Sequence, residues 1–213
     1  MSRPFIHTVS GKSVPLLDTL PDHIDIKDIA YALSRINRYT GHTAGNLYTV
    51  AHHSVLVAEL LSFWGAPDSI VKEGLLHDAG EAYYGDISSP MKRAIAISAD
   101  ENYGPGRPHP LQGVFDSVDH AIQAKFSLSA VEHPLVRRAD LVALAIESRD
   151  LFVHGPDSLP WNVPEYPPVQ APVALLHISN VPPTKLLPEG LVESKGIQDI
   201  FQGYFDNLIT KTA

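Results

Sequence analysis

The sequence predicts an all-α fold of about six or seven helices, from three observations. Apolar residues recur at intervals of three and four along most of the chain. Capping residues, glycine and proline separate these periodic stretches, as is typical of helix ends. The 213 residues, 44% of them hydrophobic and 19% charged, suit a globular domain with a sizeable core. Residues 1–23, punctuated by one glycine and three prolines, are typical of an irregular or short β arm.

Two predicted helices flank a polar loop at residues 37–43. Residues 26–36 and residues 50–64 each carry apolar side chains at helical spacing. The residues that precede them, Asp25 and Thr49, are of the types that cap helix N-termini.

The next stretch predicts two helices and a loop. Residues 69–83 are expected to form a helix with Asp68 as its cap. The sequence Ser-Ser-Pro at residues 88–90 begins a short helix that carries Lys92, because proline is favoured in the first turn. Residues 98–110 contain glycine and proline and are expected to form a mobile loop.

The remaining elements complete a single domain over residues 1–213, with its core at about 24–152. Helices are predicted over residues 111–126 and 135–152, followed by a proline-rich segment at 153–196. That segment is long for a structureless loop and is expected to hold short strands or a lid. A C-terminal amphipathic helix is predicted over residues 197–210.

Charge and composition exclude several classes of protein. The net charge of -8 disfavours binding to polymeric nucleic acid. The chain has no cysteine, which excludes disulfides and cysteine-based metal or catalytic sites. It has no signal-peptide core and no apolar run near the roughly 20 residues that span a bilayer. We therefore expect a cytoplasmic protein that does not bind membranes.

Three predicted helices place ionisable residues on faces that should be buried: His53, the pair His77–Asp78, and Asp140. Each alone is ordinary, since a histidine on an apolar stripe is more often a satisfied core residue. Together they place two imidazoles and two carboxylates in one core, which costs several kcal/mol unless the charges are paired or metal-bound. Mixed nitrogen and oxygen ligands suit Mn, Fe, Co, Ni or Zn better than Ca.

The order His, His-Asp, Asp on separate helices resembles the HD superfamily of phosphohydrolases. Residues 50–58 (VAHHSVLVA), residues 76–87 (LHDAGEAYYGDI) and residues 139–141 (ADL) resemble the motifs of bacterial 5′-deoxynucleotidases. The phage dATP triphosphohydrolases share the same pattern. The resemblance covers about residues 24–152 and implies an HD-domain helical bundle with its metal site between the core helices.

The resemblance implies roles for the residues of these motifs. The metal ligands would be His53, His77, Asp78 and Asp140. Glu81 would take part in proton transfer with the attacking water, as a general acid–base group does. For Asp86 the alternatives are protonation of the leaving 5′ oxygen, a share in a second metal site, and a structural cap.

Substrate-binding residues are implied in the same way. Arg38 and Lys92 match phosphate-contacting cations, and the planar guanidinium of arginine suits bidentate phosphate binding. Tyr39 stands where the deoxynucleotidases have a tryptophan that shapes the sugar pocket. Because its hydroxyl is able to hydrogen-bond, selectivity for deoxyribose stays open.

The expected activity is hydrolysis of the 5′ phosphoester of a nucleotide, with a divalent ion such as Co, Mn, Zn or Fe and with Mg as the candidate for a second site. A monophosphate would release phosphate and a triphosphate would release triphosphate, and the sequence leaves both open. The alternatives are a signalling-nucleotide hydrolase and a catalytically silent nucleotide-binding module. The resemblance also implies a homo-oligomer.

Overall fold

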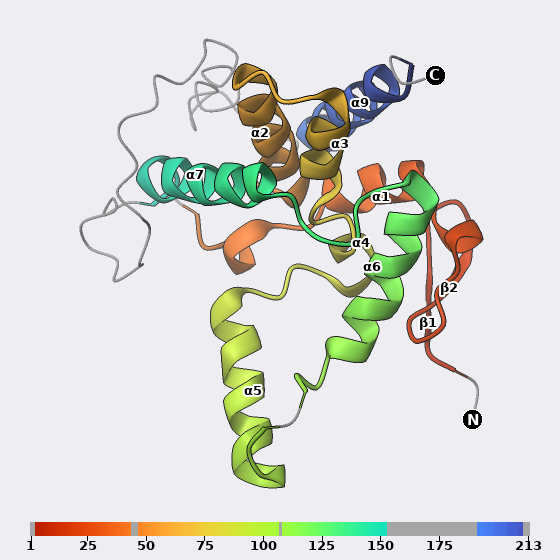
Figure 1. The fold of residues 1–213 in the computed structure, drawn as a ribbon, viewed down its shortest axis with the longest axis vertical. Helices are drawn as coiled ribbons and strands as arrows, with labels where there is room; N and C mark the ends of the chain where they lie inside the picture. The colour runs from red at the N-terminus through yellow and green to blue at the C-terminus, as the bar shows by residue number, and fades with distance from the viewer. Residues whose placement is uncertain (1–2, 44–46, 107, 153–190, 211–213) are drawn as a thin grey trace.

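The computed structural model describes residues 3–43, 47–106, 108–152 and 191–210, and it confirms the all-α prediction (Figure 1). The one sheet in these residues is a two-stranded antiparallel hairpin of β1 (Phe5–His7) and β2 (Ser13–Pro15). The other elements, in chain order, are η1 (Pro21–His23), α1 (Ile26–Leu33), η2 (Arg38–Gly41), α2 (Val50–Phe63), α3 (Asp68–Leu76), α4 (Glu81–Tyr84), α5 (Ser89–Tyr103), α6 (Gln112–Phe126), α7 (Pro134–Asp150) and α9 (Leu191–Thr210).

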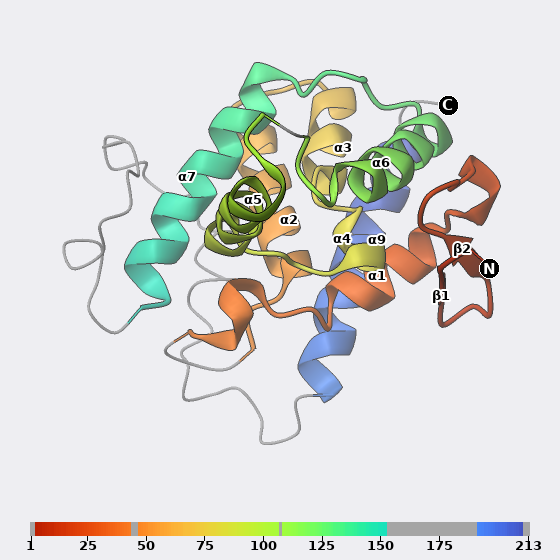
Figure 2. The ribbon, with the colours of Figure 1, turned by 90° about the horizontal axis from the view of Figure 1, so that it is seen from below.

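Helix α2 is the centre of the core. Ten of its 14 residues are buried, because apolar side chains occupy nearly its whole circumference rather than one stripe. It packs against α3, α7 and α9. Figure 2 shows α2 between α7 on one side and α3 and α9 on the other. A polar residue on α2 is therefore surrounded by other helices.

The ends of the chain close the core. In α9 the residues Ile197, Phe201, Phe205 and Leu208 are buried, and the helix begins at Leu191, earlier than the predicted start at residue 197. At the other end, the buried carboxylate of Asp28 accepts hydrogen bonds from the main-chain nitrogen of the hairpin residue Ser10, at 3.0 Å, and from its hydroxyl, at 2.7 Å. The β arm is thus fixed to α1.

The prediction of one helix over residues 69–83 is wrong. Helix α3 ends at Leu76, and the chain then turns through bonds of the i to i+3 type, such as Glu81 nitrogen to Asp78 oxygen at 3.0 Å. Gly80 lies in this turn, and a Cβ atom there would be 2.2 Å from Oδ1 of Asp119 on α6. Glycine therefore permits the close approach of α6 to the turn.

The prediction of a loop over residues 98–110 is also wrong in its first half. Helix α5 continues to Tyr103, where Gly104, with φ of 89°, ends it. Figure 1 shows α5 extending away from the other helices. The expectations for residues 153–190 lie outside the described residues. No helix among the described residues has the length and apolarity to cross a membrane.

Candidate metal centre

Three side chains from separate parts of the fold meet in the core. His53 lies on α2, His77 follows α3, and Asp140 lies on α7, and one ligand atom of each falls within 4.8 Å of the others. Nε2 of His53 is 3.2 Å from Nε2 of His77 and 3.2 Å from Oδ1 of Asp140. The packing of α3 and α7 against α2 produces this meeting. The group has a geometry able to hold a metal ion.

Asp78 adds a second carboxylate to this group. Its Oδ2 lies 3.2 Å from Nε2 of His77 and 3.6 Å from Nε2 of His53. The turn after α3 thus directs both members of the His77–Asp78 pair at the same point. The structure brings all four predicted ligands together.

The outer nitrogen of each histidine is held by an acceptor. Nδ1 of His77 lies 2.7 Å from the carbonyl oxygen of Gly74, and Nδ1 of His53 lies 2.6 Å from Oε1 of Glu147. A carbonyl and a carboxylate accept hydrogen bonds, so each Nδ1 carries a proton. In the neutral rings both Nε2 atoms then present lone pairs to each other at 3.2 Å. Such a contact needs a proton or a metal ion between its atoms.

The charges of the group favour a cation. Burial alone would lower the pKa of His77, but the neighbouring Asp78 carboxylate raises it to about 9. Burial would likewise raise the pKa of Asp78, yet His77 holds it well below its usual range. Two carboxylates beside two imidazoles therefore attract positive charge, which a proton supplies when no metal is bound.

Glu147 is the support of the site, although the sequence assigns it no more than a structural or supporting part beside Asp140. It is 2% exposed and binds four groups: Nδ1 of His53, the hydroxyl groups of Tyr39 and Tyr48, and the guanidinium of Arg38. Burial would raise its pKa, but His53 and Arg38 lower it to about 2. It lies seven residues after Asp140, so both occupy nearly the same face of α7.

Glu81 lies in the first turn of α4 and is 6% exposed. Its Oε2 is buried and has no hydrogen-bond partner among the described residues. Burial, with the carboxylates of Asp78 and Asp86 nearby, raises the pKa of Glu81 to about 9. Burial also raises the pKa of Asp86. The structure thus places the carboxyl groups of Glu81 and Asp86 near the candidate ligands. Both groups take up a proton more easily than an ordinary carboxyl group.

Of the predicted substrate-binding residues, Arg38 contacts the group, Tyr39 contacts its support Glu147, and Lys92 lies over Phe115. Nη1 of Arg38 is 3.4 Å from Oδ2 of Asp78, and Lys92, in the first turn of α5, places Nζ 5.5 Å from the centre of the Phe115 ring. Tyr39 donates its hydroxyl to Glu147, and its ring meets Phe152 edge-on at 5.1 Å. Its hydroxyl therefore supports His53 through Glu147.

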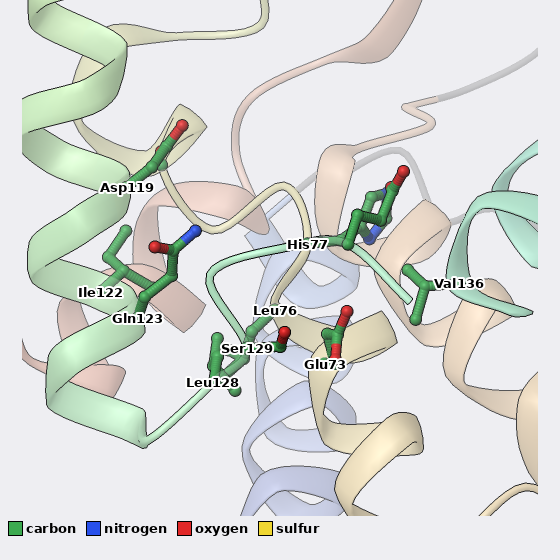
Figure 3. A pocket seen from close by; sticks show the side chains of 11 residues that line it. Glu73, Leu76, His77, Asp119, Ile122, Gln123, Leu128, Ser129 and Val136 are labelled. Atoms are coloured by element: carbon green, nitrogen blue, oxygen red, sulfur yellow. The ribbon is translucent and has the colours of Figure 1, made fainter. Parts of the chain in front are cut away.

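A pocket of about 120 Å³ opens on the α6 side of His77 (Figure 3). Its polar lining includes the carboxylates of Glu73, Asp119 and Glu132, and it contains no arginine or lysine. Such a lining repels phosphate, because like charges destabilise each other in a partly buried site. Arg38 and Lys92 are both absent from it, so a phosphate group would have to meet the four ligands outside this pocket.

Comparison with known proteins finds two relatives. The chain is 37% identical over 147 residues, 69% of its length, to an uncharacterized protein of Escherichia coli strain K12, YfdR, and covers 72% of that protein. It is 34% identical over 152 residues, 70% of its length, to an uncharacterized protein of Rhodobacter capsulatus, RCAP_rcc00048, and covers 71% of it. No family model matches the sequence.

Proposed function

We propose that this chain, which belongs to the same family as YfdR of Escherichia coli, is a metal-dependent phosphohydrolase of the HD type that cleaves the 5′ phosphoester of a nucleotide. The observation that carries the proposal is the 3.2 Å contact between Nε2 of His53 and Nε2 of His77, with the carboxylates of Asp78 and Asp140 around them.

The donor set fits a divalent transition ion. It consists of two imidazole nitrogens and two carboxylate oxygens with no thiolate, a combination suited to Mn, Fe, Co or Zn. The hydrogen bonds from Nδ1 of His53 to Glu147 and from Nδ1 of His77 to Gly74 fix both rings for ligation. When bound, the metal polarises a phosphate oxygen and lowers the pKa of a bound water towards neutrality.

Glu81 is the residue that would transfer a proton during hydrolysis. Its carboxyl is buried, and its Oε2 lacks a hydrogen-bond partner among the described residues, so it is available to a water molecule or a leaving oxygen. A carboxyl whose pKa is raised to about 9 takes up and releases a proton near neutral pH more readily than an ordinary glutamate. Asp86, whose pKa burial also raises, is the second candidate for protonating the leaving 5′ oxygen.

Substrate phosphate would be held by Arg38 and Lys92. Arg38 is anchored at its Nε side by Glu147, 3.4 Å away, and at its Nη1 by Asp78. These contacts fix the guanidinium beside Asp78, where it would meet a phosphate group bound at the ligands. The exposed Arg137, 3.9 Å from Oδ2 of Asp140, supplies a further cation of the kind that a triphosphate needs.

The experiment is product analysis with purified protein. The protein is incubated with Mn²⁺ or Co²⁺ and with ribo- and deoxynucleoside mono- and triphosphates, and the released products are separated by chromatography. We expect nucleoside together with phosphate or triphosphate, loss of activity on chelation, and recovery when metal is restored. Metal-loaded protein that hydrolyses none of these nucleotides would contradict the proposal and favour a nucleotide-binding role or a signalling-nucleotide substrate.

A further inference from the structure

Helix α5 has few contacts with the rest of the described chain: His109 and Phe115 contact Lys92 near its N-terminus. None of its 15 residues is buried, and Met91 and Ile97 are 55% and 59% exposed. Its residues 94–97 nevertheless read Ala-Ile-Ala-Ile, an apolar run expected in a covered helix. Isolated helices of this length are marginal in water, because most helical stability comes from packing. The composition of α5 therefore indicates that another surface covers it.

The charges of α5 are arranged against its own dipole. Lys92 and Arg93 stand near its N-terminus, whereas Asp100 and Glu101 stand near its C-terminus. A helix dipole favours the opposite placement, by about 0.3–1 kcal/mol for each charge. Neither Arg93 nor Glu101 forms an ion pair with a described residue. An antiparallel helix with the same sequence would present acidic groups to this basic end and basic groups to this acidic end.

Three residues of α5 are spaced as a twofold axis between two antiparallel helices requires. Arg93, Ile97 and Glu101 are four residues apart, so they lie along one face of α5. We propose that two copies of the chain form a dimer through antiparallel α5 helices, with the axis at Ile97. Each Arg93 then faces Glu101 of the partner subunit, and the two Ile97 side chains meet at the centre.

The size of this surface sets the strength of the dimer. A helix of 15 residues is about 22 Å long, and one helix pair covers less than the roughly 800 Å² per partner of a standard interface. The dimer is therefore weak and depends on protein concentration.

Charge reversal tests the pairing. Sedimentation velocity of the full chain over about 1–200 μM, a range that brackets micromolar affinity, should show a monomer–dimer equilibrium. Arg93→Glu and Glu101→Arg should each shift it to monomer, because each creates two like-charge contacts. An equimolar mixture of the two variants should dimerise again, because both contacts become attractive. A wild-type chain that stays monomeric, or single variants that dimerise like wild type, would overturn the proposal.

A cysteine at the axis gives an independent readout. The chain has no cysteine of its own, so Ile97→Cys introduces a single thiol that would face its own copy. Mild oxidation should crosslink this variant into a disulfide dimer, whereas Lys125→Cys, on the exposed part of α6, should remain monomeric. Equal crosslinking of the two variants would contradict the proposed axis. Circular dichroism of each variant checks that the helices are retained.

Discussion

Nδ1 of His53 lies 2.6 Å from Oε1 of Glu147, and both side chains are excluded from solvent. The bond fixes which ring nitrogen carries the proton, and it directs Nε2 at Nε2 of His77 and Oδ1 of Asp140. A carboxylate behind a histidine ligand orients the ring and raises the basicity of the ligating nitrogen. Glu147 thus prepares the site without pointing into it.

Glu147→Gln should weaken metal binding by about 10- to 100-fold. Glutamine has the same shape, but its amide group brings donors to a position where His53, Tyr39 and Tyr48 already donate. The measurement is Mn²⁺ or Co²⁺ affinity by titration calorimetry. Glu59→Gln is the matched control, because Glu59 also accepts a tyrosine hydroxyl, from Tyr204 at 2.9 Å, but at the packing of α2 with α9. Equal affinity in the two variants would refute the supporting role of Glu147.

Asp78→Ala should lose both bound metal and hydrolysis. The substitution removes one of the two carboxylates around the histidine Nε2 atoms, and Arg38 loses its partner at 3.4 Å. Elemental analysis of the purified variant measures the metal, and phosphate or triphosphate release measures turnover. Asp22→Ala, in the exposed part of η1, should retain both. Full activity of Asp78→Ala at low added metal would show that the four residues are not the site.

Glu81→Gln should keep the metal and lower kcat by about 100- to 10,000-fold, the range for removal of a general acid–base group. Glutamine keeps the volume and hydrogen-bonding capacity of Glu81 but does not exchange a proton at neutral pH. Glu132→Gln is the control, since Glu132 is exposed and lines the pocket beside His77. A near-native kcat for Glu81→Gln, with metal bound, would assign Glu81 a structural role.

Asp119→Asn should stabilise the fold at alkaline pH. Burial raises the pKa of Asp119 to about 6, above the roughly 3.9 of an unfolded aspartate, so folding disfavours its charged form. This destabilisation of the folded state is present above pH 6 and disappears as the pH falls towards 4. After allowance for solvent screening, we expect about 1–2 kcal/mol of added stability at pH 8 and none at pH 4.

Urea unfolding at the two pH values measures this difference. Asparagine retains an acceptor for the Tyr84 hydroxyl, 3.2 Å from Oδ1, so the packing against α4 is kept. Asp116→Asn, exposed on the same helix, should change stability by less than about 0.5 kcal/mol. A gain for Asp119→Asn that is the same at both pH values would show that its charge is not the cause.

The sequence by itself determined the helical class of the fold and several helix limits. Asp25 caps α1 by accepting from the main-chain nitrogen of Lys27 at 3.0 Å, and α9 follows the predicted apolar spacing, because caps and periodicity are local properties. The sequence also identified His53, His77, Asp78 and Asp140 as candidates, because the sequence pattern alone shows ionisable residues on otherwise apolar helix faces.

Only the tertiary structure decided where those residues lie relative to one another and what holds them. After α3 ends at Leu76, the chain turns so that Gly80 lies against Asp119 of α6, a contact that no local pattern encodes. The role of Glu147 depends on partners about 100 residues away along the chain, Tyr48 and His53, brought to it by the packing of α7 against α2. Long-range contacts of this kind form only when whole helices pack together, so no local pattern in the sequence predicts them.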